Sequence, residues 1–219
     1  SIGNGYEGST ELVDAYQKAS TDFHQTVADL VGIERVQAKT IGLGLMYGMG
    51  KNKLATSLGV SKEEATLLIS KYNRKVPFVK MLSDRCMQTA SDKGVIRTKK
   101  GRKCRFNMWE PKDFGLYTAE TFDNAVAKYG RENIKRAYTY KALNRLIQGS
   151  SADQTKQAML ACYEEGYLPI LQLHDELCFN IKSKADAAKI KKTMENCIEF
   201  KLPFVVDVKT GGSWGTAHD

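Results

Sequence analysis

Residues 34–50, ERVQAKTIGLGLMYGMG, contain the pattern on which the interpretation of this chain depends. Arg35, Lys39, Leu43 and Tyr47 recur at intervals of four, and Gly48 follows the tyrosine. On a helix, side chains four residues apart lie along one stripe. A core stripe would not begin with two cations, and a solvated stripe would not need leucine and tyrosine. The stripe suits a ligand with a polyphosphate at one end and a flat base or sugar at the other, although spacing alone slightly favours an ordinary amphipathic helix with surface cations.

A second informative stretch is LQLHDELCFNI, residues 171–181. Apolar residues alternate with other residues on both sides of its centre, which predicts two short strands joined by a tight turn. The turn carries Asp175 and Glu176 directly after His174. Two carboxylates in a hairpin turn are, taken alone, usually a solvated turn.

Together the two stretches resemble motifs of the family A DNA polymerases, the group related to bacterial DNA polymerase I. The pattern Arg-x-x-x-Lys-x-x-x-Leu-x-x-x-Tyr-Gly is similar to the nucleotide-binding helix of the fingers, and His-Asp-Glu is similar to the palm metal hairpin. The resemblance runs from about residue 11 to the end. Three further pieces fall in the family's order: His24, ALNRLIQGSSAD (142–153) and LPFVVDVKTGGSWGTAH (202–218).

The resemblance implies a role for each residue of the predicted nucleotide site. Arg35 and Lys39 would hold the incoming triphosphate, and Lys39 could also donate a proton to departing pyrophosphate. The other nucleotide-binding positions are Leu43, Tyr47, Gly48 and His24. Many relatives have an aromatic residue at the position of Leu43, so we expect altered sugar discrimination.

The resemblance also implies metal and DNA contacts. Asp175 would ligate metal as a catalytic residue, and Glu176 would support it. Magnesium prefers oxygen ligands, and two ions would assist the transfer. The implied contacts with primer–template are Asn144, Gln148, Gln172 and His174. For His174, an ordinary turn histidine is an equal alternative.

Six cations fall within nine residues that contain no acid: Arg97, Lys99, Lys100, Arg102, Lys103 and Arg105. The surrounding stretch GVIRTKKGRKCRF, residues 94–106, predicts a two-stranded ribbon around a Lys-Lys-Gly turn. Cations this close repel one another and favour a polyanion, although a solvated loop is the common alternative. We expect the ribbon to bind DNA without sequence preference, through its first five cations.

Composition indicates an ordinary globular chain of 219 residues, with 42% hydrophobic and 26% charged residues and a net charge of +8. No apolar run approaches membrane-spanning length, and the N-terminus lacks the layout of a signal peptide. We therefore expect a cytoplasmic protein of a bacterial or phage-infected cell, with no membrane partner. Five scattered cysteines without a Cys-x-x-Cys pair predict reduced thiols rather than zinc or disulfides.

Periodicity predicts an α+β fold. The resemblance implies mainly helical fingers inserted in part of an antiparallel palm sheet. Helices are expected at 11–31, 34–47, 61–91 (broken at Pro77), 118–129, 134–164 and 184–201. Strands are expected in the ribbon, in a hairpin at 168–181 and at 204–208, whereas 107–117 is poorly patterned. The predicted domains are 1–33 (palm-to-fingers helix with a loose N-terminus), 34–93 (fingers) and 94–219 (palm portion).

One family motif, an Asp-x-Ser-x-x-Glu-Leu-Arg-like strand upstream, is not found, and the thumb and exonuclease regions are also absent. We therefore expect the C-terminal subunit or fragment of a template-directed DNA polymerase that adds dNTPs to primer 3′ ends by two-metal transfer. A second polypeptide would supply the missing carboxylate, the thumb and an exonuclease. The alternatives are a non-catalytic module that binds primer–template or single-stranded DNA and, less favoured, a relative of the single-subunit RNA polymerases.

Overall fold

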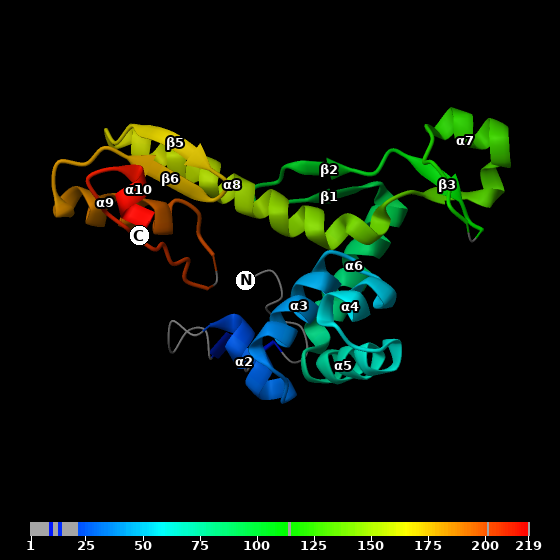
Figure 1. The fold of residues 1–219 in the computed structure, drawn as a ribbon. Helices are drawn as coiled ribbons and strands as arrows, with labels where there is room; N and C mark the ends of the chain where they lie inside the picture. Colours follow the sequence, from blue (N-terminus) through cyan, green and yellow to red (C-terminus); the bar gives the residue numbers. More distant parts are fainter. Residues whose placement is uncertain (1–8, 11–12, 15–21, 114, 201, 219) are drawn as a thin grey trace. The chain divides into compact units, whose positions relative to one another are not determined.

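The computed structural model describes residues 9–10, 13–14, 22–113, 115–200 and 202–218 (Figure 1). Its contacts divide the chain into two compact units, Ile2–Ile147 and Gln148–Asp219, and each is described by itself. Helices predominate in the described residues, and the strands form three two-stranded antiparallel sheets. The predicted α+β class is confirmed.

From residue 23 to residue 93, the first unit consists of five helices: α2 (Phe23–Val31), α3 (Arg35–Met46), α4 (Lys51–Leu58), α5 (Lys62–Lys75) and α6 (Pro77–Lys93). They pack on one another around a core that includes Val27, Ile41, Leu54 and Tyr72. α3 contacts α2, α4, α5 and α6, so the helix that carries the four-residue stripe lies at the centre of this cluster (Figure 1).

The ends of these helices follow local signals. The Asp22 side chain accepts hydrogen bonds from the backbone N–H groups of His24 and Gln25, and so caps α2. The non-helical backbone of Asp22 shows that a single helix over 11–31 was a wrong prediction, although 11–12 and 15–21 lie outside the described residues. Ser61 caps α5 and Pro77 begins α6, as predicted.

The predicted basic ribbon is confirmed. β1 (Val95–Arg97) pairs antiparallel with β2 (Lys103–Arg105), and Arg97 lies opposite Lys103. Beyond the ribbon, β3 (Trp109–Pro111) pairs with β4 (Ile134–Arg136), and α7 (Phe122–Tyr129) lies between them in sequence.

Two predicted helices in this region begin later than expected. The helix expected over 118–129 begins four residues later, at Phe122, after the extended Thr121. The helix expected over 134–164 is β4 at its beginning, and Tyr138 then adopts a left-handed backbone with φ of 61°. A left-handed residue cannot continue a right-handed helix, so α8 spans Ala142–Glu164.

Arg136 joins three segments of the first unit. Its Nη1 donates a hydrogen bond to the Phe106 carbonyl at 2.9 Å, and its Nε donates to the Ser91 carbonyl at 3.2 Å. The guanidinium carbon lies 4.6 Å from the centroid of the Trp109 ring. Gly94 ends α6 with φ of 65°, and a β-carbon there would lie 2.6 Å from Arg136 Cζ. Position 94 therefore needs glycine for its backbone and for the close approach of Arg136.

The second unit contains most of α8, followed by β5 (Pro169–Leu173), β6 (Glu176–Phe179), α9 (Lys184–Asn196) and α10 (Trp214–His218). The predicted hairpin is confirmed as the β5–β6 pair. α9 begins at a capping box formed by Ser183 and Asp186 and ends at Asn196, before the predicted end at 201. The strand predicted at 204–208 was wrong: no strand forms there, and the Val206 N–H donates instead to Glu195 Oε1 at 2.9 Å.

Two further observations concern membrane-spanning segments and the cysteines. Among the described residues, no helix combines the length and apolar character needed to cross a membrane. All five cysteines carry free thiols, and burial raises the pKa of Cys86 and, to about 11, that of Cys162.

Candidate functional site

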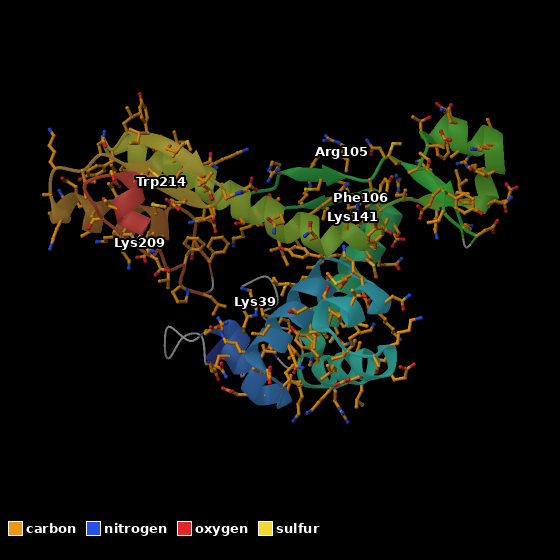
Figure 2. All side chains as sticks on the ribbon, viewed as in Figure 1. Lys39, Arg105, Phe106, Lys141, Lys209 and Trp214 are labelled. Atoms are coloured by element: carbon orange, nitrogen blue, oxygen red, sulfur yellow. The ribbon has the colours of Figure 1, made fainter. Side chains whose placement is uncertain are left out.

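The predicted stripe lies on the outward face of α3. Arg35, Lys39 and Tyr47 are exposed and Leu43 is half-buried. The opposite face buries Ala38, Ile41, Gly42 and Gly44. The four-residue spacing therefore separates a ligand-accessible row from the core face of one helix, and Figure 2 shows Lys39 on this helix.

The core face of α3 rests on Tyr72 of α5. Tyr72 is fully buried, and burial raises the pKa of its hydroxyl to about 12. Its hydroxyl oxygen has no hydrogen-bond partner within the described residues. A β-carbon at position 42 would lie 3.0 Å from this oxygen, so Gly42 is what allows α3 to pack against the tyrosine.

Three predicted nucleotide-binding residues share one electrostatic environment. Arg35 forms an ion pair with Asp22, and its Nε donates to Asp22 Oδ2 at 2.7 Å. The Arg35 hydrogen bond is the largest cause of a lowered Asp22 pKa. Burial lowers the pKa of His24, and the charges of Lys39 and Arg35 lower it further, although Asp22 opposes them. The structure thus brings together His24, Arg35 and Lys39, with Asp22 as a partner that the sequence prediction missed.

The end of α3 meets the segment that leads into α8. Gly48 follows the exposed Tyr47 with φ of 69°, and a β-carbon there would lie 3.0 Å from Tyr140 Cδ2. Tyr140 is 47% exposed, and the Lys141 Nζ lies 5.5 Å from its ring centroid. Figure 2 labels Lys141 near the start of α8. Two exposed aromatic residues therefore adjoin Gly48: Tyr47 precedes it in sequence, and Tyr140 packs against it.

The basic ribbon has distinct faces. All six of its cations are exposed, whereas Ile96 and Phe106 are buried. Arg97 and Lys103 are direct cross-strand partners, and like charges in such a pair destabilise a sheet. Clustered like charges of this kind favour an anion as a partner.

The start of α8 packs against this ribbon. Arg145 Nη1 donates to the Arg105 carbonyl at 3.0 Å, and the Arg145 guanidinium carbon lies 4.7 Å from the Phe106 ring centroid. Arg105 and Phe106 are labelled on β2 and just after it in Figure 2. On the same helix, Asn144 is half-buried and Gln148, four residues later, is exposed. These two predicted DNA contacts therefore lie on one side of α8.

The β5–β6 hairpin presents its two-residue turn to solvent. Leu173 pairs with Glu176, which leaves His174 and Asp175 as the turn, and both are exposed. His174 has φ of 53°, a left-handed conformation that costs a non-glycine residue about 1–2 kcal/mol. Gln172 Nε2 donates to the His174 carbonyl at 3.2 Å. The turn therefore holds Asp175 at the tip of the hairpin at some conformational cost.

The carboxylates of the hairpin differ in their surroundings. Asp175 is exposed, whereas Glu176 is half-buried and its Oε1 accepts hydrogen bonds from Trp214 Nε1 at 3.3 Å and Cys178 Sγ at 3.5 Å. In the part of the chain that the structure describes, no group of three His, Cys, Asp or Glu side chains could hold a metal ion. Magnesium is commonly held by one or two carboxylates with phosphate oxygens and water, so Asp175 fits as one ligand of a set completed by other groups.

Residues 6–216 match the family model described as DNA polymerase family A. This chain belongs to DNA polymerase family A. The resemblance inferred from the α3 stripe and the His-Asp-Glu turn is thereby confirmed.

Relatives within family A include phage and bacterial enzymes. The DNA-directed DNA polymerase of Pseudomonas phage M6 is 37% identical over 240 residues, which cover 94% of this chain and 33% of the relative. DNA polymerase I of Caldicellulosiruptor bescii is 33% identical over 221 residues, which cover 93% of this chain and 24% of the relative. The chain thus spans about a third of the phage relative and about a quarter of the bacterial one.

A solved structure supports the fold assignment. The POL domain of Pol1 from M. smegmatis, in complex with DNA primer-template and dNTP, has a TM-score of 0.76 and 26% sequence identity. The similarity covers 96% of this chain and 37% of that chain. The chain therefore has the fold of a part of a family A polymerase domain.

Proposed function

We propose that this chain forms the nucleotide-binding part, and one metal-binding part, of a template-directed DNA polymerase that adds dNTPs to a primer 3′ end. The exposed stripe on α3 carries the proposal, because it presents two cations, an apolar side chain and a ring in sequence. The phage and bacterial relatives support this reaction and a cytoplasmic location. On this proposal, 34–93 corresponds to the fingers, with 1–33 leading into them and 94–219 belonging to the palm.

The two cations of the stripe would have different chemical roles. The planar guanidinium of Arg35 can fork onto two phosphate oxygens. Lys39 neutralises phosphate charge and is the group that can give a proton to departing pyrophosphate. Leu43 and Tyr47 then meet the sugar and base, and Gly48 allows the base to approach the backbone. His24, electrostatically coupled to both cations, completes the nucleotide site.

Asp175 is the proposed metal ligand of this chain, and Glu176 supports it. Two Mg²⁺ ions would supply stabilisation of the negative charge on the attacking 3′-oxygen and on the leaving pyrophosphate. Gln172 and His174 adjoin the same turn, where we place the primer end. Because one exposed carboxylate cannot position two ions, a second carboxylate must come from elsewhere.

The exposed apolar surface of this hairpin supports the proposal that another polypeptide supplies the second carboxylate. Ile170, Leu171 and Leu173 of β5 are 56%, 47% and 44% exposed. A two-stranded sheet is at best marginally stable alone, and an apolar strand edge invites pairing with another strand. We propose that a second polymerase polypeptide, which carries the upstream carboxylate strand, the thumb and an exonuclease, covers this hairpin.

DNA binding is proposed for the ribbon and for α8. Arg97, Lys99, Lys100, Arg102 and Lys103 would contact the phosphate backbone without reading sequence. Asn144 and Gln148 would contact the minor groove of the primer–template. Such an interface makes affinity strongly dependent on salt.

Primer extension with the complete polymerase tests the proposal. We expect Asp175→Ala to abolish extension, because the metal site loses the ligand that this chain contributes. Asp113→Ala, which removes an exposed aspartate outside every proposed contact, should leave extension unchanged. Extension that persists in Asp175→Ala would refute the metal assignment, and unchanged dNTP affinity in Arg35→Ala would refute the assignment of the stripe.

A non-catalytic DNA-binding module is the alternative that the exposed ribbon favours. Such a module has no need of a metal carboxylate or a triphosphate site. Mg²⁺-dependent binding of a fluorescent dNTP that is lost in Asp175→Ala would exclude it. Comparison of dNTP with rNTP incorporation by the active protein separates a DNA polymerase from an RNA polymerase.

A further inference from the structure

The segment that follows α9 returns to the metal hairpin and touches it at Glu176. Trp214, the first residue of α10, donates its indole N–H to Glu176 Oε1 at 3.3 Å, across 38 residues of sequence. The Cys178 thiol donates to the same oxygen at 3.5 Å. Glu176 and Cys178 are two residues apart on β6, so their side chains lie on one face of that strand. One carboxylate oxygen is therefore held from two directions.

The segment around Trp214 is itself held in a defined shape. Ser213 N–H donates to Thr216 Oγ1 at 2.9 Å, and Thr216 N–H donates to Ser213 Oγ at 3.3 Å. A β-carbon at Gly211 would lie 2.6 Å from the Ala217 backbone nitrogen, so the segment folds back tightly on itself. Figure 2 shows Trp214 on α10, next to β6. The indole N–H is thus presented to Glu176 by a rigid turn rather than by a loose tail.

The indole and the thiol are neutral donors, and their hydrogen bonds orient the Glu176 carboxylate. The carboxylate that is exposed at the turn is then Asp175 alone.

We propose that Trp214 and Cys178 are positioning residues of the metal hairpin, which fix the Glu176 carboxylate on β6 so that Asp175 is presented to Mg²⁺ beside an oriented carboxylate. This role rests on the proposed function, because only the proposed function assigns Asp175 and Glu176 to a metal site. Neither Trp214 nor Cys178 touches substrate in it. Partners that orient metal ligands typically change metal affinity or activity by about 10- to 100-fold when removed.

The contact itself can be tested without any catalytic assay. Trp109 and Trp214 are the two tryptophans of the chain, so Trp109→Phe leaves Trp214 as the sole indole fluorophore. In that background, Glu176→Ala, which removes the acceptor, should shift the Trp214 emission. An emission that is identical with Glu176 and with Ala at this position overturns the proposal.

The role is tested by the Mg²⁺ dependence of primer extension in the complete polymerase. Trp214→Phe keeps the ring but removes the N–H, and should raise the half-maximal Mg²⁺ concentration by about tenfold. Cys178→Ala should act in the same direction, whereas Cys178→Ser, which keeps a donor, should restore the parent value. Trp109→Phe is the matched control and should change nothing. In a Glu176→Ala protein, Trp214→Phe should have no further effect, because both changes remove the same contact.

Several results would contradict this role. Unchanged Mg²⁺ dependence in Trp214→Phe, with only a lower melting temperature, would reduce Trp214 to a packing residue. Additive effects of Trp214→Phe and Glu176→Ala would show that the two residues act separately. If the parent protein does not extend primers at all, the proposed function fails and this role fails with it, whereas the fluorescence response would still show the contact. The two failures are therefore distinguishable.

Discussion

The buried hydroxyl of Tyr72 makes a quantitative prediction about the stability of the α3 packing. Burying a hydroxyl without a hydrogen bond costs about 1–3 kcal/mol, and Tyr72 Oη has no partner within the described residues. We therefore expect Tyr72→Phe to raise the free energy of unfolding by about 1–3 kcal/mol. Tyr163→Phe is the control, since Tyr163 is 62% exposed and its change should lie within about 0.5 kcal/mol.

The same hydroxyl sets an alkaline limit to stability. Burial raises the pKa of Tyr72 from 10.0 to about 12, so the unfolded chain loses this proton first as the pH rises. The stabilising contribution of the protonated form is complete below about pH 10 and is lost as the pH passes through about 12. A shift of two pKa units corresponds to about 2.7 kcal/mol. The stability advantage of Tyr72→Phe over the parent should grow by about this amount between about pH 9 and about pH 12.

A second substitution isolates the contact with α3. Alanine is favoured over glycine inside a helix by about 1 kcal/mol, but a β-carbon at position 42 meets Tyr72 Oη at 3.0 Å. With Phe at position 72, the nearest atom becomes the ring carbon at 3.7 Å, an ordinary contact distance. Gly42→Ala should therefore stabilise the Tyr72→Phe protein by about 1 kcal/mol and give no such gain in the parent.

Urea denaturation of the full chain, followed by far-UV circular dichroism, measures all four proteins of this cycle. Equal slopes and shifted midpoints would indicate changes in stability alone. The reasoning would be refuted if Tyr72→Phe lowered the free energy of unfolding by about 1 kcal/mol, which is the usual result of removing a satisfied hydrogen bond. Equal effects of Gly42→Ala in both backgrounds would also refute it.

The remaining predictions concern the ligand sites. His174→Gly should relieve about 1–2 kcal/mol of left-handed strain and raise the melting temperature while primer extension falls, and an unchanged extension rate would show that the strain has no function. Asp22→Asn keeps a helix-capping residue but removes the charge that pairs with Arg35. Fluorescence anisotropy should therefore show tighter dNTP binding. Weaker binding would mean that the ion pair organises the site. Lys99→Ala and Lys100→Ala should each reduce the slope of log K against log salt by about 0.9 if they contact phosphates, and an unchanged slope would remove the ribbon from the DNA interface.

Features encoded by neighbouring residues were predictable from the sequence. The stripe on α3 follows from spacing, and its exposed face is the one that the pattern of cations and ring indicated. Pro77 divides α5 from α6 because its ring and missing N–H disrupt a helix interior, whereas the first turn tolerates it. The ribbon around residues 99–101 likewise follows from a local turn signal.

Elements that depend on distant pairing were not predictable in the same way. β4 takes its strand conformation from β3, more than 20 residues earlier, and nothing in its own sequence indicates that partner. α4 was missed because eight residues with two buried side chains, Leu54 and Ala55, give too little periodicity. The β-branched residues at 204–208 favour a strand, but a strand forms only beside another strand.

In the candidate site, too, single residues were predictable but contacts between distant residues were not. Sequence patterns indicated Arg35 and Asp175. They did not indicate the hydrogen-bond partner of Arg35 or that of Glu176, the neighbour of Asp175. Asp22 is 13 residues from Arg35, and a helix-capping aspartate was the signal that could have found it. Trp214 is 38 residues from Glu176, and no local pattern connects them.

The packing of Gly94 against Arg136 limits the order in which this chain can change during evolution. Any larger residue at position 94 meets a guanidinium that is already held by two carbonyl groups and a tryptophan ring. A smaller side chain at position 136 must therefore come first, and that intermediate loses the junction between α6, the ribbon and β3. We expect relatives to retain the glycine–arginine pair together or to have replaced both, so two positions 42 residues apart should covary as one unit.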